Sequence, residues 1–306
     1  MKTLGKILVP ILLFIALIFV IIKMDTITEY IASYLKSTPK IVIPPGNEYT
    51  KKNNYLFLQP NKDFVPLSRQ DLINIFYSII NNGYEKFTFY CPEEYTNCIE
   101  DVKDISDNNE LLTHINNYTH PYNNFNSFKT FFENSGEVTV EITRLYDEKT
   151  KNEIEDKINS VISKNLSADM DDQTKILTIH DYIINNSKYD VEKNETGISE
   201  YHSSIAYGPL IEGYAICGGY ADAMAIFLTK LGFDNYKIAS DTHVWNAVLV
   251  NGKWLHLDLT WDDPVSEQGV DYLYHKYFLV NNEELIKADG NLNNHLFKKA
   301  IYLEFK

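Results

Sequence analysis

Residues 242–261 read THVWNAVLVNGKWLHLDLTW, and this stretch gives the clearest signal of local structure in the chain. Asn251 and Gly252 form the dipeptide that is typical of a two-residue β-hairpin turn, and both flanks read as strands. A two-residue loop places Val250 opposite Lys253 and thereby fixes the register of the whole hairpin. The stretch therefore predicts an antiparallel pair of strands with a defined pairing.

That register places His243 and Asp258 on one face of the hairpin. Counted from the turn, Trp245 lies opposite Asp258, and His243 lies opposite Thr260. Diagonal neighbours lie roughly 7–8 Å apart at the backbone, a distance that an imidazole and a carboxylate can span with a hydrogen bond. Such a carboxylate fixes the tautomer of the imidazole and aims its second nitrogen outward. His256 lies on the same face and is a rival base, and a purely structural His–Asp pair is the alternative.

The preceding segment, GYAICGGYADAMAIFLTKLGF at 213–233, predicts a helix that begins near Cys217. Its apolar residues recur at steps of three and four, and Gly232 supplies a left-handed stop. The start of a helix favours an anion and therefore a thiolate. Because free cysteines are usually buried packing residues, Cys217 needs a partner to be a nucleophile. His243 and Asp258 are the candidate partners.

The composition limits the classes of protein to which the chain can belong. The 306 residues are 44% apolar and 13% aromatic, enough for a sizeable core in one large or two medium domains. The formal net charge of −14 argues against nucleic acid as the main partner, because phosphate binding needs a basic face.

Residues 7–22, ILVPILLFIALIFVII, predict a membrane segment. Lys2 and Lys6 precede it and hold the N-terminus inside, so we expect a single-pass signal-anchor over 1–24 with the bulk of the chain outside the cytoplasm. A cleaved signal peptide and secretion are the alternative. Residues 37–54 contain a PPG sequence and charged residues, which predict that 25–54 is an extended linker.

The cysteines are interpreted in the light of export. Cys91 and Cys98, in CPEEYTNC, are close enough in sequence to form a disulfide, which would leave Cys217 unpaired. The sequence leaves this pairing open, because it does not give the distance between the two Cα atoms. Four ligands at zinc-binding spacing are absent from the sequence.

Residues 55–150 predict an α+β accessory domain that could position a substrate or space the core from the membrane. Ser68 is a good N-cap for its first helix, and we interpret His180, in a later helix, as a hydrogen-bonded packing residue. The predicted helices are 68–84, 152–166 and 171–190, and the predicted strands of the accessory domain are 84–92 and 136–146.

Three motifs in order carry a resemblance to a known family. EGYAICGGYADAMAIFLTKLGF, HVWNAV and NGKWLHLDLTWDDP look like the core of the transglutaminase-like superfamily, specifically of its bacterial exported members. Flanking segments extend the resemblance to about 155–285. It implies that Cys217 is the nucleophile, His243 the general base and Asp258 the orienting acid. It also implies acyl transfer through a thioester, and no cofactor is implied. Together with the predicted export anchor, the triad leads us to expect peptide or protein substrates at the cell envelope.

The predicted fold class is therefore α+β. The resemblance implies a papain-like core in which a helix carrying the cysteine packs on an antiparallel sheet, preceded by a smaller α+β domain and a transmembrane helix. The predicted segments are the anchor, the linker, the accessory domain and the transglutaminase-like domain, at 1–24, 25–54, 55–150 and 151–306.

The family logic also suggests an oxyanion hole. It would use backbone N–H groups at Cys217 and Gly218 and a polar side chain just upstream, for which Tyr207 is the best candidate. No Gln or Trp stands at the usual place, and Tyr207 is nearly as well explained by packing.

Two other functions stay open. The chain could be a catalytically silent surface scaffold that retains the triad residues and binds a peptide or glycan. Metal binding by His243, His256 and Asp258 is the weakest of the three hypotheses.

Overall fold

The computed structural model describes residues 40–60, 65–133, 135–264 and 272–306. The expected anchor at 7–22 and the first part of the expected linker lie outside the described residues. Within them, no helix combines the length and the apolar character that a membrane span requires. Residues 41–306 form one compact unit, without a division near residue 150.

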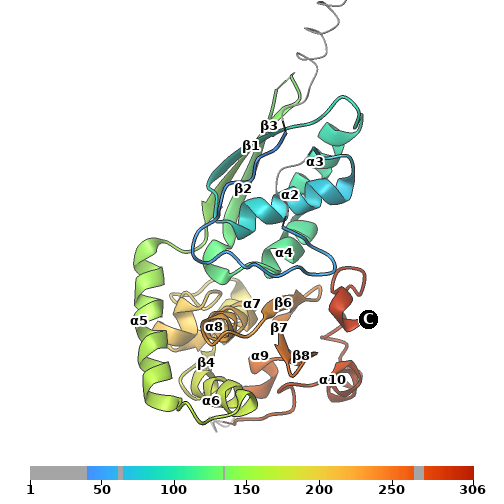
Figure 1. Cartoon of the computed structure of the whole chain (residues 1–306). Coiled ribbons are helices and arrows are strands. Elements are labelled where there is room, and N and C mark those ends of the chain that lie inside the picture. Colours follow the sequence, from blue (N-terminus) through green and yellow to red (C-terminus); the bar gives the residue numbers. More distant parts are fainter. Residues whose placement is uncertain (1–39, 61–64, 134, 265–271) are drawn as a thin grey trace, which may run out of the picture. The chain divides into compact units, whose positions relative to one another are not determined.

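The first half of this unit is a three-stranded antiparallel sheet with helices packed against it (Figure 1). The strand order is β1-β3-β2. Ser68 caps the first helix as expected, because its side chain accepts from the N–H of Asp71. The elements are α2 (Arg69–Asn81), β1 (Lys86–Tyr90), α3 (Cys98–Asp107), α4 (Asn109–Asn117), a 3-10 turn (Pro121–Asn123), β2 (Phe125–Phe132) and β3 (Glu137–Arg144).

A disulfide links the segment after β1 to the start of α3. It joins Cys91 to Cys98, whose Cα atoms lie 5.6 Å apart. Cys217 is the free cysteine.

The second half contains the predicted hairpin and the helix before it. The sheet is antiparallel in the order β6-β7-β8, and helix α8 packs against β6 and β7. A short parallel pair, β4 and β5, lies before α8. The elements are α5 (Glu148–Asn165), α6 (Asp172–Asn185), β4 (Lys188–Tyr189), α7 (Val191–Thr196), a π-helical turn (Gly208–Glu212), β5 (Tyr214–Ala215), α8 (Cys217–Lys230), β6 (Asn235–Ala239), β7 (Val244–Val250), β8 (Lys253–Leu257), α9 (Leu259–Asp262), α10 (Asn282–Asp289) and a 3-10 turn (Leu303–Phe305).

The hairpin register is confirmed. Val250 pairs with Lys253, and the pairing follows the predicted register as far as Asn246 and Leu257, where β8 ends; beyond it, Asp258 caps α9 instead of pairing with Trp245. Asn251 and Gly252 have φ angles of 51° and 74°, the left-handed conformation that a tight hairpin turn of this kind requires.

Two hydrophobic clusters hold the unit together. One surrounds α8 and includes α5 and α6. The other joins α2 and the β1-β3-β2 sheet to residues of the second half, among them Tyr236, Trp245 and Tyr302. This shared core joins the two halves. It explains why the contacts between residues give no domain boundary near residue 150.

Candidate active site

Cys217 is the first residue of α8, where a thiolate gains most from the helix. The N-cap residue, Ile216, is extended and provides no side-chain cap. The first N–H groups of any helix lack intrahelical partners, and here no cap side chain competes for them. The N–H groups of Cys217 and Gly218 are those that the sequence suggested for an oxyanion hole.

Glycines allow a neighbouring loop to lie against this helix start. A Cβ at Gly218 would stand 2.8 Å from the carbonyl oxygen of Ser204, and one at Gly219 would stand 2.3 Å from that of Ser203. The same Ser203 oxygen accepts from the N–H of Ile216 at 2.9 Å. The two glycines thus let the backbone of the loop hold the residue that precedes Cys217.

His243 lies one residue before β7 and is bonded to Asp258 as the register predicted. The distance between His243 Nε2 and Asp258 Oδ2 is 2.6 Å. The other carboxylate oxygen of Asp258 accepts from the N–H of Thr260 at 2.9 Å and caps α9. Since Nε2 is held by Asp258, Nδ1 is the nitrogen of His243 that remains for Cys217.

The electrostatics of the pair favour a charged imidazole. Burial alone would lower the pKa of His243, but the charge and hydrogen bond of Asp258, with a smaller contribution from the hydrogen bond to Cys217, raise it to about 10. Burial likewise opposes ionisation of Asp258, yet His243 and His295 hold its pKa well below the usual range. At neutral pH the site therefore contains an imidazolium between a carboxylate and the thiol position.

The sequence reasoning missed His295 and Asp289. Nε2 of His295 lies 2.8 Å from the same Oδ2 of Asp258, and its Nδ1 lies 2.9 Å from Oδ1 of Asp289. Both residues are buried. They follow the hairpin by some thirty residues and stand in no periodic pattern or turn motif that would have pointed to them.

His256 is not placed to act as the rival base. Its Nδ1 accepts from Trp245 Nε1 at 3.0 Å, and its Nε2 lies 2.8 Å from Oδ1 of Asn282. Burial lowers its pKa to about 4. Both ring nitrogens are thus engaged within the core. Among the described residues, the side chains that could hold a metal ion together with Asp258 are His243 and His295. His256 is not part of this group.

Tyr207 directs its hydroxyl away from the role suggested for it. The hydroxyl donates to Oε2 of Glu153, on α5, at 2.6 Å. The hydroxyl proton of Tyr207 is therefore engaged in a hydrogen bond that links the segment before α8 to α5. The contacts of Tyr207 support the packing interpretation that the sequence left open.

A cleft of about 460 Å³ lies beside His243. Tyr189, Thr242 and Trp261 contribute to its lining. Burial raises the pKa of Tyr189, and the charge of a thiolate at Cys217 would raise it further. The cleft therefore offers room for a substrate next to the His243 side chain.

Comparison with known proteins identifies the core. Residues 160–259 match the sequence model of the transglutaminase-like superfamily core. No curated protein matches the chain. Among solved structures, a TGase crystal structure is similar at 14% identity over 48% of each chain, with a TM-score of 0.32. A candidate cysteine protease from Cytophaga hutchinsonii is similar at 14% identity over 48% of this chain and 65% of that one, with a TM-score of 0.28.

This chain spans less than two thirds of both solved structures. The segment that matches the family includes Cys217, His243 and Asp258. The resemblance expected from the sequence motifs is thus confirmed for this segment: residues 160–259 match the transglutaminase-like superfamily.

Proposed function

We propose that this protein is a thiol enzyme that cleaves or transfers amide bonds of peptides or proteins through a thioester on Cys217. The observation that carries the proposal is the hydrogen bond of 2.6 Å between His243 and Asp258, at a site that also holds the free cysteine at the start of α8. A helix start, an imidazole and a carboxylate are the parts that activate a cysteine.

The proposed chemistry proceeds in two halves. The Cys217 thiolate attacks the carbonyl carbon, and the N–H groups at the start of α8 stabilise the resulting oxyanion. The imidazolium of His243 then gives its Nδ1 proton to the leaving amine, and a thioester remains. In the second half, His243 takes a proton from the incoming nucleophile, which displaces the thiolate. Asp258 stays ionised and keeps the ring oriented throughout.

Water is the preferred acceptor in this proposal. Asp263 is an acidic residue in the lining of the cleft beside His243, but its carboxylate already accepts a hydrogen bond from the hydroxyl of Tyr220, so it offers no dedicated site for an amine. Hydrolysis therefore ranks above cross-linking, and transfer to an amine is the outcome that a product analysis would have to show.

The proposal also places the enzyme at the outer face of the cell membrane, anchored through residues 7–22. The apolar run and the lysines before it support this placement. The disulfide between Cys91 and Cys98 supports it independently, because such bonds persist in oxidising compartments.

The decisive experiment is the capture of the acyl-enzyme. The full-length protein is mixed with an activated ester, quenched in acid within a second, and digested for mass analysis of the peptide that contains Cys217. We expect an acyl adduct on Cys217 in the wild type and none in Cys217→Ala. His202→Ala serves as a control, because His202 forms an exposed pair with Glu212 outside the site. A wild type that never forms the adduct, with esters of several acyl groups, would remove the proposal.

A catalytically silent scaffold is the second candidate, and the contact of Tyr207 with Glu153 favours it, because it leaves the oxyanion hole without the expected side chain. If the protein is a scaffold, a peptide binds in the cleft and no acyl adduct forms on Cys217. Binding measured with Cys217→Ala and with the wild type would then give equal affinities and no covalent mass change.

A further inference from the structure

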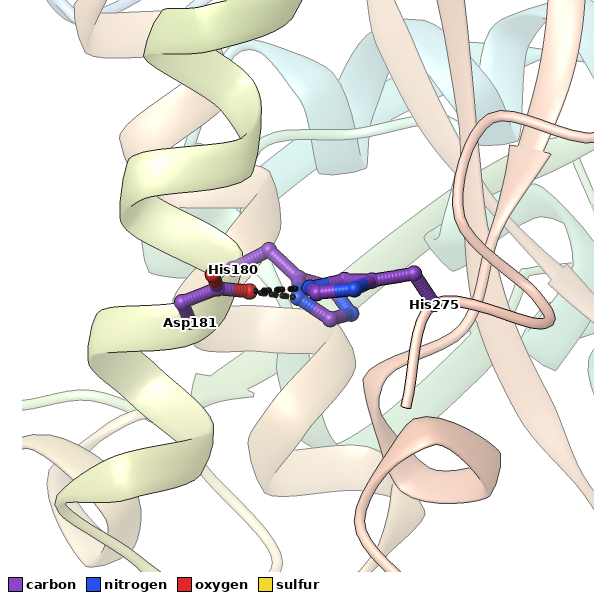
Figure 2. Close-up of side chains that lie close together, drawn as sticks. All are labelled: His180, Asp181 and His275. Atoms are coloured by element: carbon purple, nitrogen blue, oxygen red, sulfur yellow. Dashed lines mark hydrogen bonds and ion pairs between the residues drawn. The ribbon is translucent and has the colours of Figure 1, made fainter. Parts of the chain in front are cut away.

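A second cluster of side chains that could hold a metal ion is made of residues other than Cys217, His243 and Asp258. His180 and Asp181 lie on α6, and His275 lies in the segment 272–281 that precedes α10. Figure 2 shows both imidazoles directed at the carboxylate of Asp181. His180 Nδ1 and His275 Nε2 each lie 2.8 Å from the same Oδ1 of Asp181. Two rings from separate elements thus converge on one oxygen atom.

The remaining nitrogen of His180 is held in the way that metal ligands usually are. His180 is fully buried, and its Nε2 lies 3.3 Å from Oδ2 of Asp262, which is also buried. Asp262 is itself fixed, because it accepts from the N–H of Tyr277 at 3.0 Å. An imidazole that binds a metal typically donates its other N–H to a carboxylate, which fixes the tautomer and orients the ring.

Two carboxylates surround His180. Asp181 and Asp262 each lie within hydrogen-bonding distance of one of its ring nitrogens, so the cluster carries two negative charges. A divalent cation bound by Nδ1 of His180, Asp181 and His275 would balance these charges while Nε2 of His180 keeps its hydrogen bond to Asp262.

We propose that His180, Asp181 and His275 bind a divalent transition metal ion, for which Zn²⁺ is the natural probe. Two imidazole nitrogens and one carboxylate oxygen are ligands that zinc accepts, and a water molecule completes a tetrahedral site. The three donor atoms already lie within 4.8 Å of one another.

Two of the three separations between donor atoms, those from Asp181 Oδ1 to the imidazole nitrogens, need only a small adjustment. Metal–ligand bonds of about 2.0–2.1 Å in a tetrahedron separate the ligand atoms by about 3.3 Å, so the carboxylate of Asp181 has to move back by about half an ångström. The side chains of Asp181 and His275 are 29% and 43% exposed, which gives them this freedom and gives the ion access from solvent.

The group formed by His243, Asp258 and His295 offers no comparable access. Its side chains are between 1% and 8% exposed, and His243 is needed beside Cys217. A metal at Asp258 would also displace the hydrogen bond that orients His243. Metal binding at the two groups would respond to different substitutions. Variants in each group can therefore show which of them holds the ion.

The role of the proposed ion is structural and goes beyond the proposed reaction. It would join α6 to the segment 272–281, and through Asp262 it would support α9, whose N-cap is Asp258. Binding to the folded state alone raises the melting temperature with metal concentration. At 100 times the dissociation constant we expect a rise of about 5 °C.

The test uses the full-length protein, in detergent micelles, stripped of metal with a chelator. Co²⁺ is titrated while the visible absorption of a tetrahedral complex is followed, and Zn²⁺ affinity is then measured by competition with a chromophoric chelator. We expect one equivalent in the wild type and loss of that binding in Asp181→Asn and His275→Ala. Asp262→Asn should weaken Zn²⁺ binding by about tenfold to a hundredfold.

His202→Ala and His295→Ala are the controls and should bind as the wild type does. Circular dichroism of each variant checks that it is folded. His275 is exposed enough for its replacement to be tolerated, so a failure of Asp181→Asn to fold leaves the test intact. Absence of binding in the wild type would overturn the proposal, as would binding that survives in His275→Ala or that His295→Ala abolishes.

Discussion

One oxygen of Asp258 holds two imidazoles, because Oδ2 lies 2.6 Å from Nε2 of His243 and 2.8 Å from Nε2 of His295. His295 is in turn held by Asp289. The orientation of the candidate general base thus depends on a residue that lies 37 positions beyond Asp258 in the sequence. His295 is a positioning residue in this account, since it acts on His243 through Asp258.

Replacing His295 should therefore slow the reaction without abolishing it. His295→Ala leaves Asp258 Oδ2 with one partner, and the loss of a charge-assisted hydrogen bond costs about 2 kcal/mol of stability. We expect kcat to fall while KM changes little, because the cleft beside His243 is not altered. His295→Gln keeps an N–H donor and should recover part of the rate. Equal kcat values for the wild type and His295→Ala would contradict the positioning role.

Asp258→Asn should lower the pKa of His243 from about 10 toward its ordinary value of 6.5, because the carboxylate supplies the largest contribution that raises it. In the wild type, catalysis that uses the imidazolium should persist through neutral pH and decline as the pH approaches 10. In Asp258→Asn this alkaline decline should move to lower pH. An NMR titration of the imidazole, assigned by comparison with His243→Ala, measures both values. An unchanged pKa in Asp258→Asn would contradict the pairing.

The same shift has a consequence for stability. Because the pKa of His243 is raised on folding, its contribution is fully present below pH 6.5 and is lost as the pH rises through about 10. As the pH rises from 6.5 to about 10, the free energy of unfolding should therefore fall by more in the wild type than in His243→Ala. Urea unfolding at pH 6 and pH 10 gives the comparison, and parallel losses in both proteins would exclude this contribution.

Gly219→Ala should disturb the start of α8 more than Gly218→Ala does. The new Cβ would stand 2.3 Å from a backbone oxygen in the first case and 2.8 Å in the second, and backbone cannot move aside cheaply. We expect Gly219→Ala to destabilise the protein by about 1–3 kcal/mol and to slow the alkylation of Cys217. Thermal unfolding of the two variants side by side tests the order. Wild-type stability in Gly219→Ala would mean that the loop does not pack as described.

Tyr207→Phe should leave the rate within about twofold of the wild type, because the hydroxyl is bonded to Glu153 and not to the reacting groups. Removing a true oxyanion-hole donor costs about a hundredfold or more in kcat. Glu153→Gln is the matched variant and should behave alike. A hundredfold loss confined to Tyr207→Phe would restore the oxyanion role that the sequence suggested.

The sequence predicted the parts of the site that depend on local rules. Asn251 and Gly252 fix the turn, the turn fixes the register, and the register places His243 beside Asp258. Helix α2 was predicted for a similar reason, because Ser68 is a capping residue whose effect stays within one turn.

The missed features depend on tertiary packing instead. Strand β2 is partly or wholly exposed along its length, so FNSFKTFF shows no alternation between an apolar and a polar face. His295 reaches Asp258 only through the path of the chain after α10, which no periodicity encodes. The boundary expected at residue 150 was suggested by a change of pattern, whereas the shared core around Tyr236 and Tyr302 joins the two halves.

The central claim is that Cys217 and His243 form a thiolate–imidazolium pair, and the pH dependence of alkylation tests it most directly. Cys91 and Cys98 are joined, so iodoacetamide reports on Cys217. The full-length wild type should react rapidly already at pH 6, where an ordinary thiol with a pKa near 8.5 is almost entirely protonated. His243→Ala should react only as the pH approaches 8.5, and His202→Ala should match the wild type. Reaction of the wild type as an ordinary thiol, with the same pH dependence as His243→Ala, would contradict the pair and the proposed mechanism with it.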